Sequence, residues 1–164
     1  MQTVPILSGA TKGLKFNLIK TKDEFLELLE ILKKSPFTGF DIETTSLFPR
    51  TGEISLLQFF NGDSIYVVDA IELDGRYNRS DIPPMRPAPK KGVIHTPESE
   101  EWWRSYKQSD LLYRLSEFLS LTDCKKIIQN AKFESSWMQE KLNCEINAVF
   151  DTYLAGKLIN TMSD

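Results

Sequence analysis

The sequence predicts an α/β fold, in which a mixed sheet with an antiparallel meander carries helices on its faces. After a first strand and helix, three strand-like segments follow one another, and the chain then returns to helix, strand and two further helices. Helices in such an order bury their apolar faces most economically against a sheet. The chain has 164 residues, of which 41% are hydrophobic, so we predict a single domain over residues 1–164.

The first strand and the first helix are marked by their periodicity. Residues 15–19 alternate apolar and polar side chains, as a half-buried strand does. Apolar residues at helical spacing begin after Thr21, which forms a capping box with Glu24. The helix is expected to end near Lys33 and Lys34, because Pro36 follows.

The centre of the chain predicts the meander. The strand that carries Asp41 comes first, and residues 53–60 and 64–69 follow as two strands joined by the hairpin signal Asn61-Gly62-Asp63.

Residues 71–108 show no sustained apolar period and contain several prolines, so we predict a loop insertion there. Its basic and aromatic side chains are typical of a segment that binds single-stranded nucleic acid, and equally of a flexible excursion whose two tryptophans cover the core. On either interpretation, residues 74–107 are predicted to be the most mobile part of the chain.

The C-terminal third predicts helix, strand, helix and helix. Ser109 is expected to cap a helix that runs to residue 120, and residues 125–129 form a short strand. A helix over 132–141 follows, and Asp151 is the expected N-cap of the last helix.

Composition excludes several classes of protein. With 20 basic and 23 acidic residues the net charge is −3, so nucleic acid cannot be held by bulk positive charge. Cys124 and Cys144 lack the spacing of a metal motif and are expected to be reduced, half-buried thiols. The sequence shows neither a signal peptide nor an apolar run of membrane-spanning length. We therefore expect no membrane association and a location in the cytoplasm, in the nucleoid or, for a viral protein, in the host cell.

Asp41 and Glu43 are the first candidates for chemistry. Side chains of a strand alternate between faces, so these two carboxylates point the same way while Ile42 points into the packing. Two like charges at this distance repel unless a cation lies between them. Carboxylates suit Mg²⁺ or Mn²⁺, which indicates phosphoryl chemistry. The alternative is a solvated strand end that carries two exposed acids.

Three ordered segments give the chain a family resemblance: FDIETTSL at 40–47, IIQNAKFE at 127–134 and FDTYLAGKLIN at 150–160. Together they resemble the 3'-5' exonuclease (proofreading) domain of family A DNA polymerases, within the DEDD superfamily. The resemblance implies a ribonuclease H-like fold and a reaction in which two divalent ions, Mg²⁺ or Mn²⁺, help to remove nucleoside 5'-monophosphates from DNA. The implied partners are a single-stranded DNA 3' end and a polymerase domain in the same or another chain.

The resemblance also implies the site residues. Asp41, Glu43 and Glu134 correspond to catalytic metal ligands, although Glu134 is one methylene longer than the Asp usual in the family. The positions that correspond to substrate contacts are Leu47, Gln129, Asn130 and Phe133. From the residues alone, Leu47 and Phe133 are equally well explained by core packing, and Asn130 by a helix cap.

One part of the family pattern lies outside the sequence. Family members carry a third motif, Y-x(3)-D, with a Tyr and a fourth metal-binding Asp, and the sequence stops at Asp164 before it. We expect either a fragment of a longer polymerase or exonuclease or a ligand from another chain, with Asp151 as an alternative ligand. This chain alone is accordingly expected to degrade single-stranded DNA weakly or not at all. Two other functions remain open: a non-catalytic remnant that binds nucleic acid or acts as a scaffold, and an RNA-trimming enzyme related to ribonuclease D.

Overall fold

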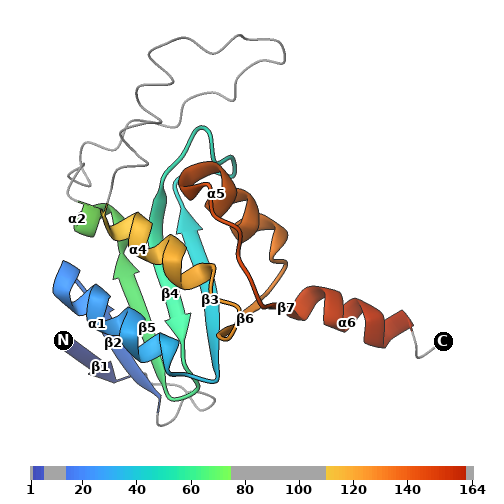
Figure 1. Ribbon diagram of the computed structural model, residues 1–164, viewed down its shortest axis with the longest axis horizontal. Coiled ribbons are helices and arrows are strands. Elements are labelled where there is room, and N and C mark those ends of the chain that lie inside the picture. The colour runs from blue at the N-terminus through green and yellow to red at the C-terminus, as the bar shows by residue number, and fades with distance from the viewer. Residues whose placement is uncertain (1, 6–13, 75–109, 162–164) are drawn as a thin grey trace.

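A computed structural model describes residues 2–5, 14–74 and 110–161 of the protein, which Figure 1 draws in colour. In chain order the elements are β1 (Gln2–Pro5), β2 (Lys15–Ile19), α1 (Lys22–Lys33), β3 (Phe37–Thr44), β4 (Ile54–Phe60), β5 (Ser64–Asp69), α2 (Ala70–Asp74), α4 (Asp110–Leu119), β6 (Lys125–Ile128), α5 (Lys132–Leu142), β7 (Val149–Asp151) and α6 (Thr152–Thr161). Seven strands form one mixed sheet in the order β1-β2-β5-β4-β3-β6-β7. The predicted fold class is therefore confirmed.

The strand β2 and the helix α1 form where the periodicity predicts them. Thr21 caps α1 as expected: its Oγ1 accepts a hydrogen bond from the Glu24 backbone N–H at 3.3 Å, and Glu24 Oε2 accepts one from the Thr21 N–H at 3.2 Å. This capping box satisfies backbone donors that the first helical turn leaves without intrahelical partners.

The strands β3, β4 and β5 form the predicted antiparallel meander. In the turn between β4 and β5, Gly62 has a φ of +97°, which glycine adopts without a Cβ clash. The register of β3 and β4 places Asp41 directly opposite Gln58. A polar side chain of β4 therefore lies beside the acidic strand.

The strands β6 and β7 extend the sheet beyond β3 in parallel orientation. Ile128, the last residue of β6, pairs with Asp151, the last residue of β7, so both strands end at one edge of the sheet. Each strand then leads within a few residues into a helix, α5 or α6. The N-termini of these two helices consequently lie next to each other.

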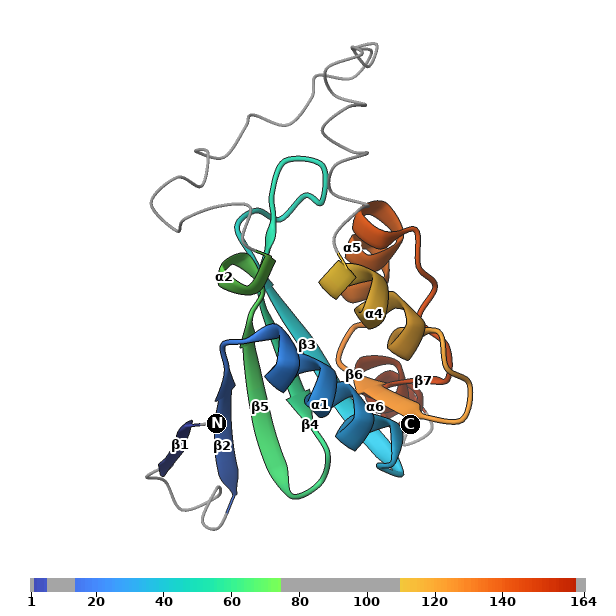
Figure 2. The ribbon, with the colours of Figure 1, turned by 60° about the vertical axis from the view of Figure 1, so that its left-hand side comes forward.

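The helices α1 and α4 cover one face of the sheet, as Figure 2 shows. Phe40 and Ile42 of β3 are buried on that face, and Trp137 of α5 belongs to the same core. The alternate side chains of β3, Asp41 and Glu43, are exposed and must face the opposite side. The same-face prediction for the two carboxylates is confirmed.

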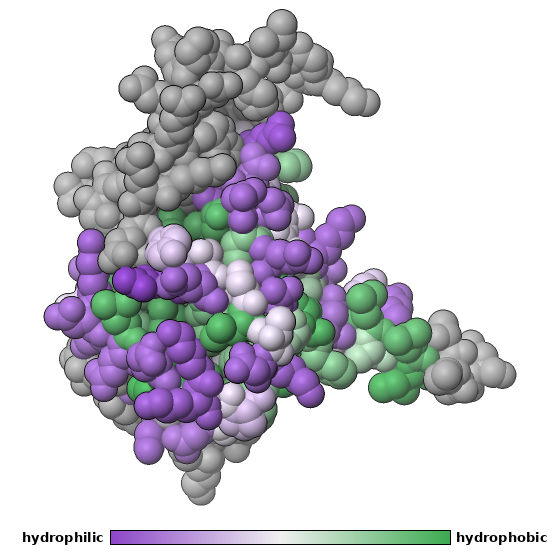
Figure 3. Space-filling view, in the orientation of Figure 1, coloured by the Kyte–Doolittle hydropathy of each residue, from purple (hydrophilic) through white to green (hydrophobic). Residues whose placement is uncertain are grey.

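The helix α6 extends away from the rest of the molecule in Figure 1. Apolar side chains along it are largely exposed; they include Leu154, Leu158 and Ile159, and Tyr153 is exposed as well. Green patches mark the projecting arm in Figure 3. In the described part of the chain, no helix is long and apolar enough to cross a membrane.

Several details differ from the sequence-based expectations. The segment expected as a loop from residue 71 begins with the helix α2, which runs to Asp74, while residues 75–109, with the expected cap Ser109, lie outside the described residues. The mobility predicted for residues 74–107 therefore falls almost entirely outside the described residues. The cysteines are free, as predicted, but buried rather than half-buried, with 2% of Cys124 and 4% of Cys144 exposed. The short elements β1, α2 and β7 were not predicted, since three to five residues are too few to display a period.

Candidate active site

The exposed end of β3 presents two carboxylates that share one neighbour. Gln58 Nε2 donates a hydrogen bond to Asp41 Oδ2 and another to Glu43 Oε1, each 3.4 Å long. Gln58 thus holds both carboxylates on one side of the sheet. The sequence analysis missed this residue, although the antiparallel meander, once its register is known, brings Gln58 to this position.

Glu134 approaches the same place from the first turn of α5. Its side chain is buried, with 3% of its surface exposed, and Oε2 has no hydrogen-bond partner. Burial, followed by the charge of Asp41, a hydrogen bond to that carboxyl and the charge of Asp151, raises the pKa of Glu134 to about 7. Asp41 and Glu134 therefore form an acidic pair in which the raised pKa favours a proton on Glu134.

The pair has the donor chemistry that a divalent cation requires. A buried carboxylate oxygen without a partner is costly, and a cation between the two carboxylates would satisfy it in place of the proton. In the described residues, however, no group of three or more acidic, His or Cys side chains is arranged around a single point that could hold a metal. Asp41, Glu43 and Glu134 thus fit a cation by their chemistry and by the unpartnered oxygen, and their assignment as ligands stays a prediction.

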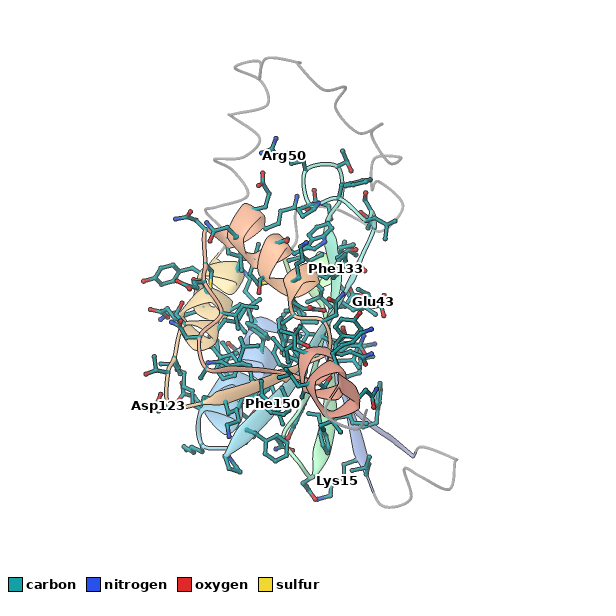
Figure 4. The ribbon with its side chains drawn as sticks, turned by 90° about the vertical axis from the view of Figure 1, so that its right-hand side faces the viewer. Lys15, Glu43, Arg50, Asp123, Phe133 and Phe150 are labelled. Atoms are coloured by element: carbon teal, nitrogen blue, oxygen red, sulfur yellow. The ribbon has the colours of Figure 1, made fainter. Side chains whose placement is uncertain are left out.

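An open groove of about 780 Å³ is lined by Asp41 and Glu134, whereas Glu43 does not line it. Among the residues that line it are Asp41, Gln58, Gln129, Asn130, Phe133 and Glu134. Figure 4 shows Phe133, from α5, just above Glu43 in that view. The structure therefore brings three of the four expected substrate-binding residues to the acidic pair.

Leu47, the fourth, lies elsewhere. It follows β3 and is 78% exposed, so core packing does not explain it, and it is not among the residues that line the groove. The helix-cap interpretation of Asn130 is wrong. The N-cap of α5 is Ala131, and the N-cap side chain makes no capping hydrogen bond. Asn130 instead adopts a left-handed conformation with a φ of +56°, which asparagine tolerates better than most residues.

Two ion pairs hold the far end of α5 to the segment that follows β3. Arg50 Nε lies 3.2 Å from Glu140 Oε1, and the fully buried Lys141 Nζ lies 3.7 Å from Glu53 Oε1. The helix that carries Glu134 is thereby tied to the same strand end that carries Asp41 and Glu43.

Asp151 caps α6, as predicted, but its carboxylate is fully engaged. Oδ1 accepts hydrogen bonds from the backbone N–H groups of Asn130, Tyr153 and Leu154, and Oδ2 accepts one from Ala131. Burial acts in the opposite sense, yet these four hydrogen bonds lower the pKa of Asp151. These hydrogen bonds give the carboxylate of Asp151 a structural role, and its assignment as the alternative metal ligand stays a prediction.

The mixed sheet carries its carboxylates at the end of one strand, opposite a carboxylate from the first turn of a helix. The family model described as 3'-5' exonuclease matches residues 16–88, which include Asp41, Glu43 and Leu47. The predicted resemblance to 3'-5' exonuclease domains is confirmed over this part of the chain. No curated protein sequence matches the chain.

Solved structures extend the likeness of fold to nearly the whole chain. The catalytic core of RRP6 from Trypanosoma brucei aligns with 98% of this chain at 15% identity and a TM-score of 0.63, and the Nibbler EXO domain from Aedes aegypti aligns with 91% at 17% identity and a TM-score of 0.60. Escherichia coli RNase D aligns with 84% at 14% identity and a TM-score of 0.54. The chain covers 34%, 58% and 27% of these three structures, so it spans about a third of the RRP6 core. At such identities the comparison establishes a shared ribonuclease H-like fold.

Proposed function

We propose that the chain provides the active site of a metal-dependent 3'-5' exonuclease, as part of a longer protein, and removes nucleoside 5'-monophosphates from a single-stranded DNA 3' end. The observation that carries the proposal is the buried Glu134, whose unpartnered oxygen lies in an acidic pair with Asp41 at one end of an open groove. An acid kept half-protonated in a groove is typical of a functional site rather than of a stable core.

The residues have separable roles in this proposal. Asp41, Glu43 and Glu134 would hold divalent ions, Mg²⁺ or Mn²⁺ and two in number, whose chemistry is to activate water and to stabilise the leaving 3' oxygen. Gln58 orients two of these carboxylates through its hydrogen bonds. Asn130 and Phe133, which line the groove, would receive the terminal nucleotide, and the exposed Leu47 would contact the strand outside it.

RNA is the second candidate substrate. Among the structures of similar fold, one is Trypanosoma brucei RNase D in complex with RNA U12, at 16% identity, and another is an EXD2 exonuclease domain soaked in Mg and dGMP. The first likeness favours an RNA substrate for this chain, and the second favours Mg²⁺ as its ion. A protein distinguishes RNA from DNA by its contacts with the 2'-hydroxyl.

The test uses this chain extended through a Y-x(3)-D motif, with single-stranded DNA and RNA of the same sequence, labelled at the 5' end, in Mn²⁺ or Mg²⁺. Successive shortening from the 3' end with release of 5'-mononucleotides is expected, and Asp41→Asn or Glu134→Gln should abolish it. The matched control is Glu27→Gln, an exposed glutamate on α1 at the opposite face of the sheet. Nucleic acid binding without any shortening would favour the non-catalytic module, and faster shortening of RNA would favour the ribonuclease D-like enzyme.

A further inference from the structure

Among the described residues, Asp151 hydrogen-bonds both to the first turn of α6 and to the turn that leads into α5. The parallel strands β6 and β7 end at the same edge, where Ile128 pairs with Asp151. The first amides of α5 and α6 therefore emerge next to each other. The first four N–H groups of any helix lack intrahelical partners, so this edge concentrates donors that need an acceptor.

The two oxygens of Asp151 serve both sets of donors. Toward α6, Oδ1 accepts from the N–H groups of Tyr153 at 2.9 Å and Leu154 at 3.2 Å. Toward α5, Oδ1 accepts from Asn130 at 3.0 Å, and Oδ2 accepts from Ala131 at 2.9 Å. Hydrogen bonds to an ionised acceptor are stronger than those between neutral groups, and the negative charge also complements the positive ends of two helix dipoles.

The contacts toward α5 hold the turn that leads into the helix, because their donors are the N–H groups of Asn130 and Ala131, just before the first residue of that helix. Its N-cap residue is Ala131, whose side chain has no acceptor. Asn130 precedes it in a left-handed conformation, which few residues adopt without support. The turn formed by residues 129–131 is thus held from outside by Asp151.

The same turn decides where the site residues point. Gln129 and Asn130 belong to it and line the groove, and Glu134 lies in the first turn of α5, three residues after Ala131. Because α5 is rigid, a change in the direction of its first turn moves the Glu134 carboxylate relative to Asp41 on β3.

From this geometry we infer that Asp151 is a positioning residue of the proposed exonuclease site: it fixes the 129–131 turn, and through it the direction of Glu134 toward Asp41, without contacting metal or substrate. The expected change in metal affinity rests on the proposed function, whereas the hydrogen bonds from the 129–131 turn to Asp151 do not. Outer residues that orient metal ligands typically change metal affinity by about 10- to 100-fold when they are removed.

Two variants separate positioning from simple capping. Asp151→Ala removes both sets of hydrogen bonds. Asp151→Ser keeps the cap of α6, because serine is as good an N-cap as aspartate. Serine has a shorter side chain with only one oxygen, so it cannot also accept hydrogen bonds from the 129–131 turn. The control is Thr21→Ala, which removes the cap of α1, a helix on the opposite face of the sheet.

The measurements are Mn²⁺ affinity by calorimetry, Tm, and exchange of individual backbone amides. We expect Asp151→Ser to regain most of the Tm lost in Asp151→Ala. Its Tyr153 and Leu154 amides should stay protected from exchange, whereas those of Asn130 and Ala131 should exchange faster. It should bind Mn²⁺ about tenfold more weakly than the wild type. Thr21→Ala should lower Tm and leave Mn²⁺ affinity unchanged.

Wild-type Mn²⁺ affinity in Asp151→Ser would overturn the inference and leave Asp151 as a cap of α6 alone. So would a crystal structure with Mn²⁺ in direct contact with Asp151. If the wild type bound no Mn²⁺, the proposed function would fail separately. The crystal structure of Asp151→Ser would then decide the inference: a Glu134 carboxylate displaced from Asp41 supports it, and an unmoved one overturns it.

Discussion

Replacing Glu134 by glutamine should change how the stability of the protein depends on pH. The pKa of this buried carboxyl rises from its ordinary value of 4.5 to about 7, first because of burial and then because of Asp41. The folded state therefore binds the proton more tightly than the unfolded chain, by up to about 3 kcal/mol at roughly 1.4 kcal/mol for each pH unit. That stabilisation is fully present below pH 4.5 and is lost as the pH rises to about 7.

Glu134→Gln has no proton to lose at this position. The free energy of unfolding of the variant, relative to that of the wild type, should thus increase by about 2–3 kcal/mol between pH 4.5 and pH 8. For a chain of this size that corresponds to a relative gain in Tm of roughly 2–4 °C per kcal/mol. The assay is urea unfolding followed by circular dichroism at pH 4.5, 6 and 8, in EDTA so that no divalent ion replaces the proton.

The control variant is Glu27→Gln, which makes the same chemical change at an exposed glutamate of α1. If the difference between Glu134→Gln and the wild type stayed constant across the pH range, Glu134 would have an ordinary pKa. The acidic pair with Asp41, and with it the physical basis of the proposed site, would be refuted.

Three further changes test other parts of the structure. Asp41→Ala should abolish the heat of Mn²⁺ binding in calorimetry, and equal heats in variant and wild type would place the metal elsewhere. Lys141→Met should cost about 3–5 kcal/mol in urea unfolding, because it leaves Glu53 without its buried cation, and adding Glu53→Gln should restore much of the loss. Ala148→Gly should raise stability by about 0.5–1 kcal/mol, since Ala148 has a φ of +54° and an L-residue is strained there; a loss of stability would show that the strain is absent.

The local elements and half of the candidate site could be predicted from the sequence. The capping box at Thr21, the turn at Gly62 and the N-cap at Asp151 are recorded in residue types a few positions apart, and the structure has all three. The common face of Asp41 and Glu43 follows from the alternation of a strand, whatever surrounds it. Such features need only the neighbouring residues along the chain.

Long-range geometry was decided by the tertiary structure. The β3–β4 register brings Gln58 to Asp41, and the position of α5 buries Glu134 beside a carboxylate 93 residues earlier in the chain. The sequence predicts Asp151 only as the N-cap of the last helix. Because β6 and β7 end at the same edge of the sheet, Asp151 also hydrogen-bonds to the turn before α5. Periodicity and capping are local properties of the backbone, whereas the distance between two carboxylates depends on how whole elements pack. For that reason the sequence by itself determined which groups are acidic and on which elements they lie, and only the placement of α5 beside β3 decided that Glu134 is buried next to Asp41.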